Sequence, residues 1–289
     1  MTETIAVVAP GEMGSAVGAR LVAAGARVVT SLQGRSKSSA IRAQRAGFAV
    51  AESDEALVAA ADFVLSIVPP GEAVGLARRL APALKQAPGR PVYVDCNAIS
   101  PKTAERIGGL LAGTECRYVD GGIIGPPPAA GTRTVLYVAG EGANEVLRLA
   151  RLGLDVRVVD GGIGAASALK MSYAGITKGL TALGTAMMLG ATRADVADAL
   201  GKELAESQPQ LLAYLARSVP AMFPKAYRWV AEMEEISQFL AADAAAEHIY
   251  RGIARLYARL AAEVGGTPDS LGHGELAQLV RFCRQVSVR

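Results

Sequence analysis

Residues 4–25 read TIAVVAPGEMGSAVGARLVAAG, an apolar run followed by a short turn and a second run rich in alanine and glycine. This pattern predicts a buried strand, a tight turn and a helix. A turn of this kind presents backbone N–H groups and the positive end of a helix dipole to a pyrophosphate. Ala9 stands where the first glycine of the usual G-x-G-x-x-G motif is expected, but two later glycines keep the close backbone approach and the helix packing. We therefore predict a dinucleotide-binding turn formed by Gly11, Glu12, Met13 and Gly14.

The segment after the second predicted strand, residues 26–31, indicates which dinucleotide binds. Folds that bind NAD usually end this strand with an acidic residue for the ribose 2′-OH, whereas an arginine suits the 2′-phosphate of NADP. Here residues 32–37 read LQGRSK, and no carboxylate lies between Glu12 and Glu52. Arg35 can offer forked donors to a phosphate, with Ser36 beside it. The alternative is that these residues only open the next helix in solvent, but the missing acid favours NADP(H).

Strands and helices continue to alternate up to about residue 160, which is typical of a doubly wound α/β domain. Further strands are predicted over residues 62–68, 91–96, 117–120, 132–139 and 155–159. Helices are predicted over residues 37–46, 53–60, 72–84, 100–112 and 142–152. The glycine- and proline-rich stretch GGIIGPPPAAG, residues 121–131, is expected to be a loop.

After residue 162 the periodicity is helical throughout. A long helix is predicted over residues 163–189, and shorter ones over residues 193–206, 210–217, 225–242, 245–264 and 275–286. We therefore predict a Rossmann-like α/β domain over residues 1–160, joined by the long helix to an all-α domain over residues 161–289.

Composition narrows the class of protein. The net charge is +3 over 289 residues and the basic residues are dispersed, which argues against a nucleic acid partner. The three cysteines and two histidines lack metal-ligand spacing, so we expect no metal site and reduced thiols. The N-terminus enters a strand directly and residues 171–192 include a lysine, so we expect neither a signal peptide nor a membrane span. These features predict a cytoplasmic protein.

Four stretches in a fixed order carry a resemblance to a known family. They are VVAPGEMG (residues 7–14), VDCNAISP (94–101), VDGGIIGPP (119–127) and GAASALKMSYAGITKG (164–179). With them, the chain resembles the β-hydroxyacid dehydrogenase and 6-phosphogluconate dehydrogenase-like superfamily over nearly its whole length. The GRS segment, the GGIIGPP loop and YRWVAEMEEI at residues 227–236 are similar to a subgroup with a distinct helical C-terminal domain of largely unassigned substrate.

The resemblance implies that Lys170 is the family lysine that hydrogen-bonds the substrate oxygen and relays its proton. The chemistry supports this role, because an ammonium beside a reacting carbonyl stabilises the developing negative charge and can supply a proton. Tyr173 lies three residues later, so both side chains can face one cleft, where the phenol could donate to the substrate oxygen. The alternatives are a lysine that snorkels from an alanine-rich helix and a tyrosine that anchors the helix in the core.

Two departures from the family pattern change the expected substrate pocket. Ala174 replaces the asparagine that often follows the lysine by one turn, and Ile124 replaces the serine of the substrate loop, although Gly125 is retained. Both changes remove polar side chains, so we expect a less polar pocket. Backbone N–H groups around Gly121, Gly122 and Gly125 are then the candidates for binding an anionic group of the substrate.

The remaining candidates lie at strand ends and in the helical half. Val68 and Pro69 are expected to line the ribose next to the nicotinamide. Asn97 stands where the family has serine; it is expected to contact the nicotinamide amide or the substrate, or else to shape the turn at a strand end. Trp229 and Glu232 could close the pocket from the helical domain and recognise an amine or hydroxyl group, although solvated acids on an amphipathic helix are a common alternative.

Together these features predict an NADPH-dependent reductase or reversible dehydrogenase that acts on a small, acidic carbonyl or hydroxy compound. Imine reduction and oxidative decarboxylation of a 3-hydroxy acid are alternatives that the same residues allow. A non-catalytic NADPH-binding sensor is an alternative of a different class. The apolar surface expected on the helical half, together with the resemblance, implies a homodimer.

Overall fold

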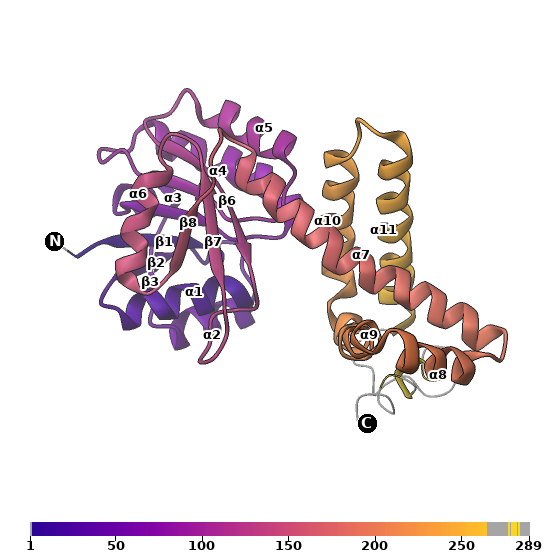
Figure 1. Cartoon of the computed structure of the whole chain (residues 1–289). Coiled ribbons are helices and arrows are strands. Elements are labelled where there is room, and N and C mark those ends of the chain that lie inside the picture. The colour runs from indigo at the N-terminus through magenta and orange to yellow at the C-terminus, as the bar shows by residue number, and fades with distance from the viewer. Residues whose placement is uncertain (1, 265–276, 278, 282, 284–289) are drawn as a thin grey trace. The chain divides into compact units, whose positions relative to one another are not determined.

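The computed structural model describes residues 2–264, 277, 279–281 and 283 (Figure 1). The chain divides into two compact units, Met1–Met171 and Ser172–Arg289. The division falls inside helix α7 (Ala165–Arg193), whereas the sequence places a boundary before this helix, near residue 160. The first turns of α7 therefore belong to the N-terminal unit, and the rest of the helix belongs to the C-terminal unit.

The N-terminal unit is built on one sheet with the strand order β3-β2-β1-β4-β5-β6-β7-β8. Neighbouring strands are parallel except β6 and β7, which pair antiparallel. The order reverses at β1, which β2 and β4 flank, and doubly wound folds bind nucleotides at such a point. The strands are β1 Thr4–Val8, β2 Arg27–Thr30, β3 Ala49–Val50, β4 Phe63–Ser66, β5 Val92–Asp95, β6 Arg117–Ile124, β7 Val135–Ala139 and β8 Asp155–Val158.

Helices cover both faces of this sheet, because alternate side chains of a strand point to opposite faces. Ile5 and Val7 of β1 enter a core with α1, α2 and α6, whereas Ala6 and Val8 enter a second core with α3, α4 and α5. The predicted α/β architecture is confirmed. The helices are α1 Glu12–Ala23, α2 Lys37–Arg45, α3 Asp54–Ala59, α4 Ala73–Lys85, α5 Pro101–Leu111 and α6 Ala143–Val146, with 3-10 turns at Pro70–Glu72 and Leu147–Leu152.

Serine caps fix where three of these helices begin. Ser36, Ser53 and Ser100 each accept a hydrogen bond from the backbone N–H three residues later. The predicted start of a helix at residue 100 is therefore confirmed, with Ser100 as the cap and Pro101 in the first turn. Such caps are readable from sequence, because donor and acceptor lie within one turn.

The prediction for residues 121–131 was partly wrong. Strand β6 runs on to Ile124, so Gly121 and Gly122 are buried strand residues that pair with Val138 and Tyr137 of β7. Two glycines favour a loop on propensity alone, but here pairing with β7 outweighs that preference. Two other details differ: the short edge strand β3 was not predicted, and the helix expected over residues 142–152 ends as a 3-10 turn after Val146.

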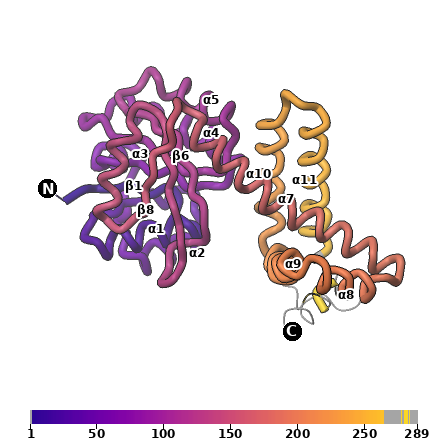
Figure 2. Tube along the Cα trace, in the orientation of Figure 1, coloured from indigo at the N-terminus to yellow at the C-terminus, as the bar shows by residue number. Residues whose placement is uncertain are grey.

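As predicted, the described residues of the C-terminal unit form helices and no strand. Beyond α7 it contains α8 Ala197–Ser207, α9 Pro209–Met222, α10 Ala226–Phe239 and α11 Ala244–Val264. Helix α9 contains Pro220 and ends at Met222, five residues beyond the predicted end at residue 217. It continues this far because Val219 and Met222 are fully buried. Helices α10 and α11 run side by side (Figure 1, Figure 2). The helix predicted over residues 275–286 lies mostly outside the described residues.

In the part of the chain that the structure describes, none of the helices combines the length and apolar character needed to cross a bilayer.

Candidate active site

The turn between β1 and α1 has the geometry that its sequence predicts. Gly11 caps α1 with an extended backbone, and a Cβ built there would have no neighbour within 4 Å. At Gly14 a Cβ would lie 2.1 Å from the carbonyl oxygen of Ala9, so the helix can approach the strand this closely only with glycine. The first N–H groups of a helix have no partner within it. The turn therefore combines open space at Gly11 with the donor end of α1, which suits an anion.

An arginine that the sequence analysis did not single out connects α2 to this turn. Arg42 donates from Nε to the carbonyl oxygen of Pro10 at 3.0 Å and from Nη2 to Ser39 Oγ at 3.2 Å. Ser36 caps the same helix, and the half-buried Arg35 directly precedes it. A guanidinium is thus fixed between the cofactor turn and the segment predicted to bind the 2′-phosphate.

Asn97 joins the ends of β4 and β5. Its side chain is 3% exposed; Oδ1 accepts from the Val68 N–H at 2.6 Å and Nδ2 donates to Ser66 Oγ at 2.8 Å. Its own N–H donates to Asp95 Oδ1 at 2.9 Å. These bonds match the alternative in which Asn97 shapes a strand end, and they fix the backbone at Val68. Pro69 follows, exposed, before the 3-10 turn. Contact of Asn97 with the nicotinamide stays a prediction.

The start of α7 is anchored by a buried carboxylate. Asp120, on β6, accepts from the N–H groups of Gly164 and Ser167 at 2.9 and 3.0 Å through Oδ2, and from Ser167 Oγ at 2.5 Å through Oδ1. Lys170 follows Ser167 by almost one turn. A Cβ at Gly122 would lie 2.9 Å from the Lys170 Cβ. The stem of Lys170 therefore packs directly on β6, and only a residue without a side chain fits beneath it.

Two opposing influences act on Asp120. Burial raises the pKa of its carboxyl above the usual value of 3.8, because burial disfavours the charged form. The hydrogen bonds from Ser167 and Gly164 favour the charged form and partly oppose this rise in pKa. The net direction is upward, so the capping carboxylate is costly to keep charged.

At the other glycines of the predicted substrate loop, the surrounding backbone leaves no space for a side chain. A Cβ at Gly121 would lie 2.7 Å from the carbonyl oxygen of Asp95, and a Cβ at Gly125 would lie 2.3 Å from that of Arg133. Gly125 also has φ +128°, a conformation that favours glycine. Ile124, half-buried, lies two residues from Gly122 and so on the same face of β6. Anion binding by these N–H groups stays a prediction.

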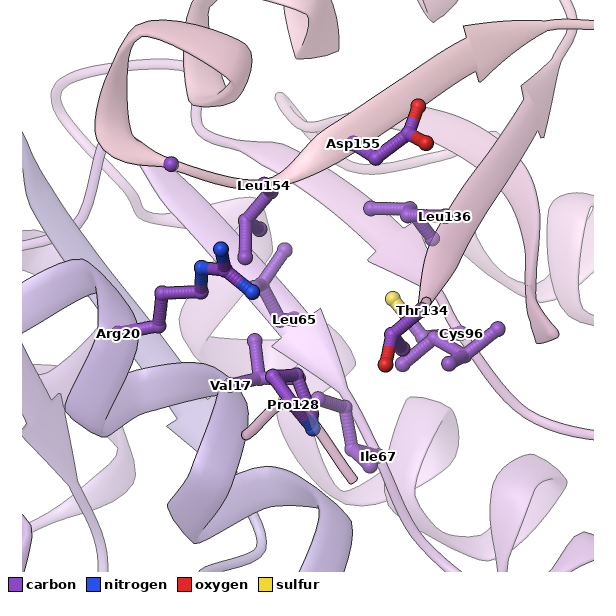
Figure 3. Close-up of a pocket in the computed structure, with 12 residues that line it drawn as sticks. Val17, Arg20, Leu65, Ile67, Cys96, Pro128, Thr134, Leu136, Leu154 and Asp155 are labelled. Carbon is purple, nitrogen blue, oxygen red and sulfur yellow. The ribbon is translucent and has the colours of Figure 1, made fainter. Parts of the chain in front are cut away.

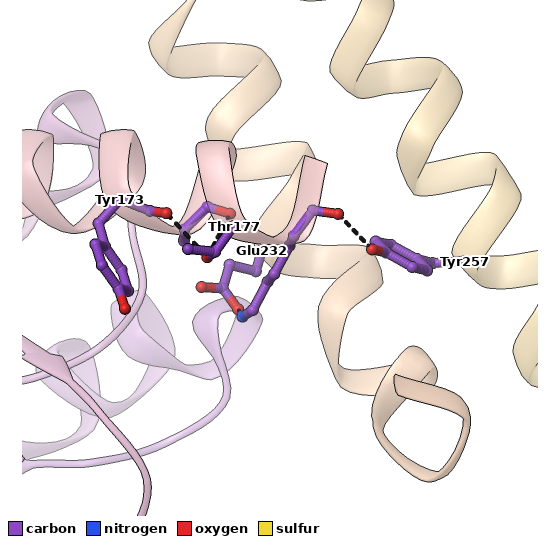
Figure 4. Close-up of polar contacts among 6 residues, drawn as sticks. Tyr173, Thr177, Glu232 and Tyr257 are labelled. Atoms are coloured by element: carbon purple, nitrogen blue, oxygen red, sulfur yellow. Dashed lines mark hydrogen bonds and ion pairs between the residues drawn. The ribbon is translucent and has the colours of Figure 1, made fainter. Parts of the chain in front are cut away.

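In the C-terminal unit, Glu232 pairs with a lysine of the protein itself. Its carboxylate contacts Lys178 Nζ, and both side chains are largely buried (Figure 4). The same ammonium lies 4.8 Å from the centre of the Trp229 ring, which packs edge-on against Tyr257. Tyr257 donates to the carbonyl oxygen of Lys178 at 2.6 Å. The acid and the aromatic ring that were predicted to recognise an amine thus surround the protein's own ammonium, and recognition of a substrate by them stays a prediction.

Comparison with known proteins decides the family. Residues 4–156, more than half of the chain, match the model of the NAD binding domain of 6-phosphogluconate dehydrogenase. The chain belongs to this family. Residues 191–260 match a domain of unknown function, DUF1932. The N-terminal unit of this 6-phosphogluconate dehydrogenase-like protein is thus an NAD(P)-binding Rossmann domain, and the protein has the fold of an oxidoreductase. The resemblance drawn from the four sequence stretches is confirmed.

Solved structures similar to this chain include hydroxyacid dehydrogenases. MTH1747, a conserved protein of unknown function with structural similarity to 3-hydroxyacid dehydrogenases, is 29% identical, with a TM-score of 0.69 over 89% of this chain and 96% of its own. The Mycobacterium tuberculosis 3-hydroxyisobutyrate dehydrogenase shares the fold, with a TM-score of 0.73 at 21% identity over 91% and 95% of the two chains. A reductive aminase from Aspergillus terreus, in complex with NADPH and ethyl-5-oxohexanoate, has a TM-score of 0.56 at 18% identity over 98% and 100%.

A small pocket of about 20 Å³, roughly the room that one water molecule needs, lies in this 6-phosphogluconate dehydrogenase-like domain (Figure 3). Apolar side chains of α1 and the sheet line it, and Arg20 points into it. Ile123 is one of its walls, whereas Gly122, which contacts Lys170, lies on the opposite face of β6. The residues that line this pocket include none of the predicted site residues. The sheet therefore separates it from Lys170.

The N-terminal unit brings some predicted residues together and adds others. Lys170 and Gly122 are in contact, and Asn97 bonds to Val68. Tyr173 is half exposed on α7, one turn after Lys170, in the other unit. The residues that sequence reasoning missed hold the predicted ones in place: Ser66, Asp120, Ser167, Arg42 and Lys178.

Proposed function

We propose that this protein is an NADPH-dependent oxidoreductase that transfers hydride between the nicotinamide and a small, acidic carbonyl or hydroxy compound, with Lys170 as the proton relay. One observation carries the proposal. The Asp120 cap and the close contact with Gly122 fix the stem of Lys170 on the sheet that bears the cofactor turn. A lysine that merely covers the surface of a helix would need neither.

The chain's own residues fit the cofactor. Open space at Gly11 and the N-terminal N–H groups of α1 suit a pyrophosphate, and Val68, fixed by Asn97, lies at the end of the neighbouring strand β4. When bound, the dinucleotide supplies or accepts the hydride. Glu12 and Met13 open α1, so their backbone N–H groups belong to this cradle.

Lys170 performs the proton chemistry in this proposal. Its ammonium donates a hydrogen bond to the substrate oxygen and stabilises the negative charge that develops there during reduction. In the same direction it delivers the proton to the new hydroxyl, and in oxidation it receives that proton back. A fixed stem matters for this step, because a displacement of about 1 Å in a catalytic group can cost about 100-fold in rate.

We propose that the preference for NADPH rests on Arg35 and Ser36, and that Arg42 adds a second positive charge near them. We expect Arg35→Ala to weaken NADPH binding about 10-fold, because a forked, charge-assisted contact with the 2′-phosphate is lost. NADH has no 2′-phosphate, so its binding does not depend on this contact. The affinity for NADH should therefore change less than about twofold. Titrating both cofactors into the wild type and the variant by fluorescence measures this. Equal weakening of NADH and NADPH would contradict the assignment.

A substrate screen tests the reaction itself. The protein is incubated with NADPH and small oxo acids, or with NADP and the matching hydroxy acids, and absorbance at the nicotinamide band reports turnover. We expect oxidation of at least one hydroxy acid and reduction of its oxo acid. Tight cofactor binding without turnover on any carbonyl, hydroxyl or imine compound would favour the sensor alternative instead.

Imine reduction is the second candidate, and Tyr173 is the observation that favours it. A phenol one turn from Lys170 is half exposed and could donate a proton to nitrogen. The shared fold of the Aspergillus terreus reductive aminase supports including cyclic imines in the same screen. Loss of imine reduction, but not of carbonyl reduction, in Tyr173→Phe would assign the two chemistries to different residues.

A further inference from the structure

Arg42 connects helix α2 to the turn that opens α1. Its Nε donates to the carbonyl oxygen of Pro10 at 3.0 Å, although the two residues lie 32 positions apart in the chain. Its Nη2 donates to Ser39 Oγ at 3.2 Å, within α2 itself. A guanidinium is planar and its donors point in fixed directions. The two bonds together therefore fix both the direction in which the side chain leaves α2 and the place where it meets the turn.

The bond to the turn acts on one peptide unit, the unit that joins Pro10 to Gly11. Its carbonyl oxygen accepts from Arg42, and its N–H donates to the carbonyl oxygen of Ala9 at 2.8 Å. Because a peptide unit is planar, restraint at both ends keeps its plane from rotating. Gly11 is the N-cap of α1, so this plane sets the direction from which the chain enters the helix and its first N–H groups.

The turn needs such a restraint because glycine leaves it free to move. Glycine adopts backbone angles that other residues avoid, and a Cβ at Gly11 would have no neighbour within 4 Å. The open space that suits a phosphate therefore also allows the turn to take other conformations. A turn that becomes ordered only when its ligand binds lowers the affinity by the entropy it loses, whereas a turn that is already held avoids this loss.

We propose that Arg42 is a positioning residue for the pyrophosphate of the cofactor. By holding the peptide unit between Pro10 and Gly11, it keeps the turn in its binding conformation before the dinucleotide arrives. The inference rests on the dinucleotide site of the proposed function. Arg42 then acts on the part of the cofactor that NAD and NADP share, whereas Arg35 acts on the 2′-phosphate that only NADP carries.

The contacts of Arg42 distinguish this role from that of a residue that only supplies charge. Its side chain is half-buried, and the atom that it bonds in the turn is a neutral backbone oxygen. Arg45 lies three residues further along α2 and is exposed. Both residues carry the same charge on one helix, and Arg42 is the one that the structure bonds to Pro10. An effect of charge should therefore be shared by the two arginines, and an effect of the bond should belong to Arg42.

Fragments of the cofactor test the proposal. ADP carries the pyrophosphate without the 2′-phosphate, and 2′-AMP carries the 2′-phosphate without the pyrophosphate. We expect Arg42→Gln to weaken the binding of ADP, NADH and NADPH about 10-fold each, because a charge-assisted bond that preorganises the turn is lost. Binding of 2′-AMP should weaken less than about threefold. Arg35→Ala should show the reverse pattern, with 2′-AMP weakened about 10-fold and ADP less than about twofold. Isothermal titration calorimetry measures each affinity.

Two variants and a salt series separate the bond from the charge. Arg45→Gln is the matched control and should change the affinity for ADP less than about twofold. Arg42→Lys keeps the charge but loses the fixed fork, so its affinity for ADP should stay within about threefold of that of Arg42→Gln. The ratio of the ADP affinities of the wild type and Arg42→Gln should persist when salt is raised from about 0.1 to about 0.5 M, a change that screens distant charges.

Far-UV circular dichroism and Tm show whether each variant is folded at 20 °C. Arg42→Met keeps a long stem and provides a second test if Arg42→Gln does not fold. A folded variant that binds ADP as tightly as the wild type would overturn the proposal, and so would equal losses for ADP and 2′-AMP, which would indicate general damage to the site. A wild type that binds neither NADH nor NADPH would instead contradict the cofactor site of the proposed function, so the two failures are distinguishable.

Discussion

Replacing Lys170 with methionine is expected to lower kcat about 100- to 1,000-fold on whichever oxo acid the screen identifies. The variant removes the ammonium but retains an unbranched stem, so the packing on Gly122 is preserved. Binding of NADPH should stay within about twofold of the wild type, because Lys170 acts on the substrate oxygen in this proposal and has no part in holding the dinucleotide. Steady-state rates and a fluorescence titration of NADPH measure the two effects separately.

Two comparisons make this result specific. Lys102→Met changes an exposed lysine on α5 and should leave both kcat and NADPH affinity unchanged. Lys170→Arg keeps a positive charge but changes the shape of the donor, so it should recover only part of the lost rate. If Lys170→Met retained the rate of the wild type, the proton relay would have to be assigned to another group. Loss of NADPH binding in the same variant would show instead that Lys170 belongs to the cofactor site.

Features that depend on residues close together in the chain could be predicted from sequence. The turn at residues 11–14 follows from the strand before it and the helix after it, and the cap at Ser100 lies three residues from its donor. Helix α7 is recognisable from one long helical pattern that contains glycines but no proline. The catalytic role of Lys170 is predicted from the resemblance, because a lysine in an alanine-rich helix does not by itself indicate a catalytic residue.

Features that depend on partners far apart in the chain could not be predicted in the same way. Asp120 caps a helix that begins 45 residues later, at Ala165, and its role is invisible until β6 and α7 are placed together. Extension of β6 through Gly121 and Gly122 requires pairing with β7, against the preference of glycine for turns. Glu232 looks like a solvated acid on its own helix, yet its partner is Lys178, 54 residues earlier. Such contacts are fixed by packing rather than by local pattern.

Removing the carboxylate of Asp120 is expected to produce the largest loss of stability among the changes considered in the N-terminal unit. In Asp120→Ala the N–H groups of Gly164 and Ser167 and the hydroxyl of Ser167 lose their buried acceptor. The free energy of unfolding should fall by about 3 kcal/mol, since each unsatisfied buried donor costs about 1–3 kcal/mol and part is recovered by relaxation. For a chain of this size this corresponds to a decrease in Tm of roughly 5 °C.

Asp120 is also expected to act as a positioning residue for Lys170. Because the cap fixes the first turn of α7, its loss should lower kcat about 10- to 100-fold at 20 °C, where the variant is still folded, while NADPH affinity is retained. Asp120→Asn is the matched variant: its oxygen can still accept from the two N–H groups, and its amide can donate to Ser167 Oγ. It should keep most of the stability and rate. A variant Asp120→Ala that loses stability but keeps kcat would show that the cap serves folding alone.

The pH dependence of stability separates the charge of Asp120 from its hydrogen bonds. The pKa of this carboxyl is raised in the folded protein above its usual value of 3.8, chiefly by burial, so the folded state holds the proton more tightly than the unfolded state does. The stability that this preference provides is fully present below pH 3.8 and is lost as the pH rises through the folded pKa. Asp120→Asn does not titrate. The Tm of the wild type, measured relative to that of Asp120→Asn, should therefore decrease as the pH is raised from about 4 to about 7. A difference in Tm that stays constant or grows over this range would mean that the hydrogen bonds to the carboxylate, rather than its burial, dominate its energetics.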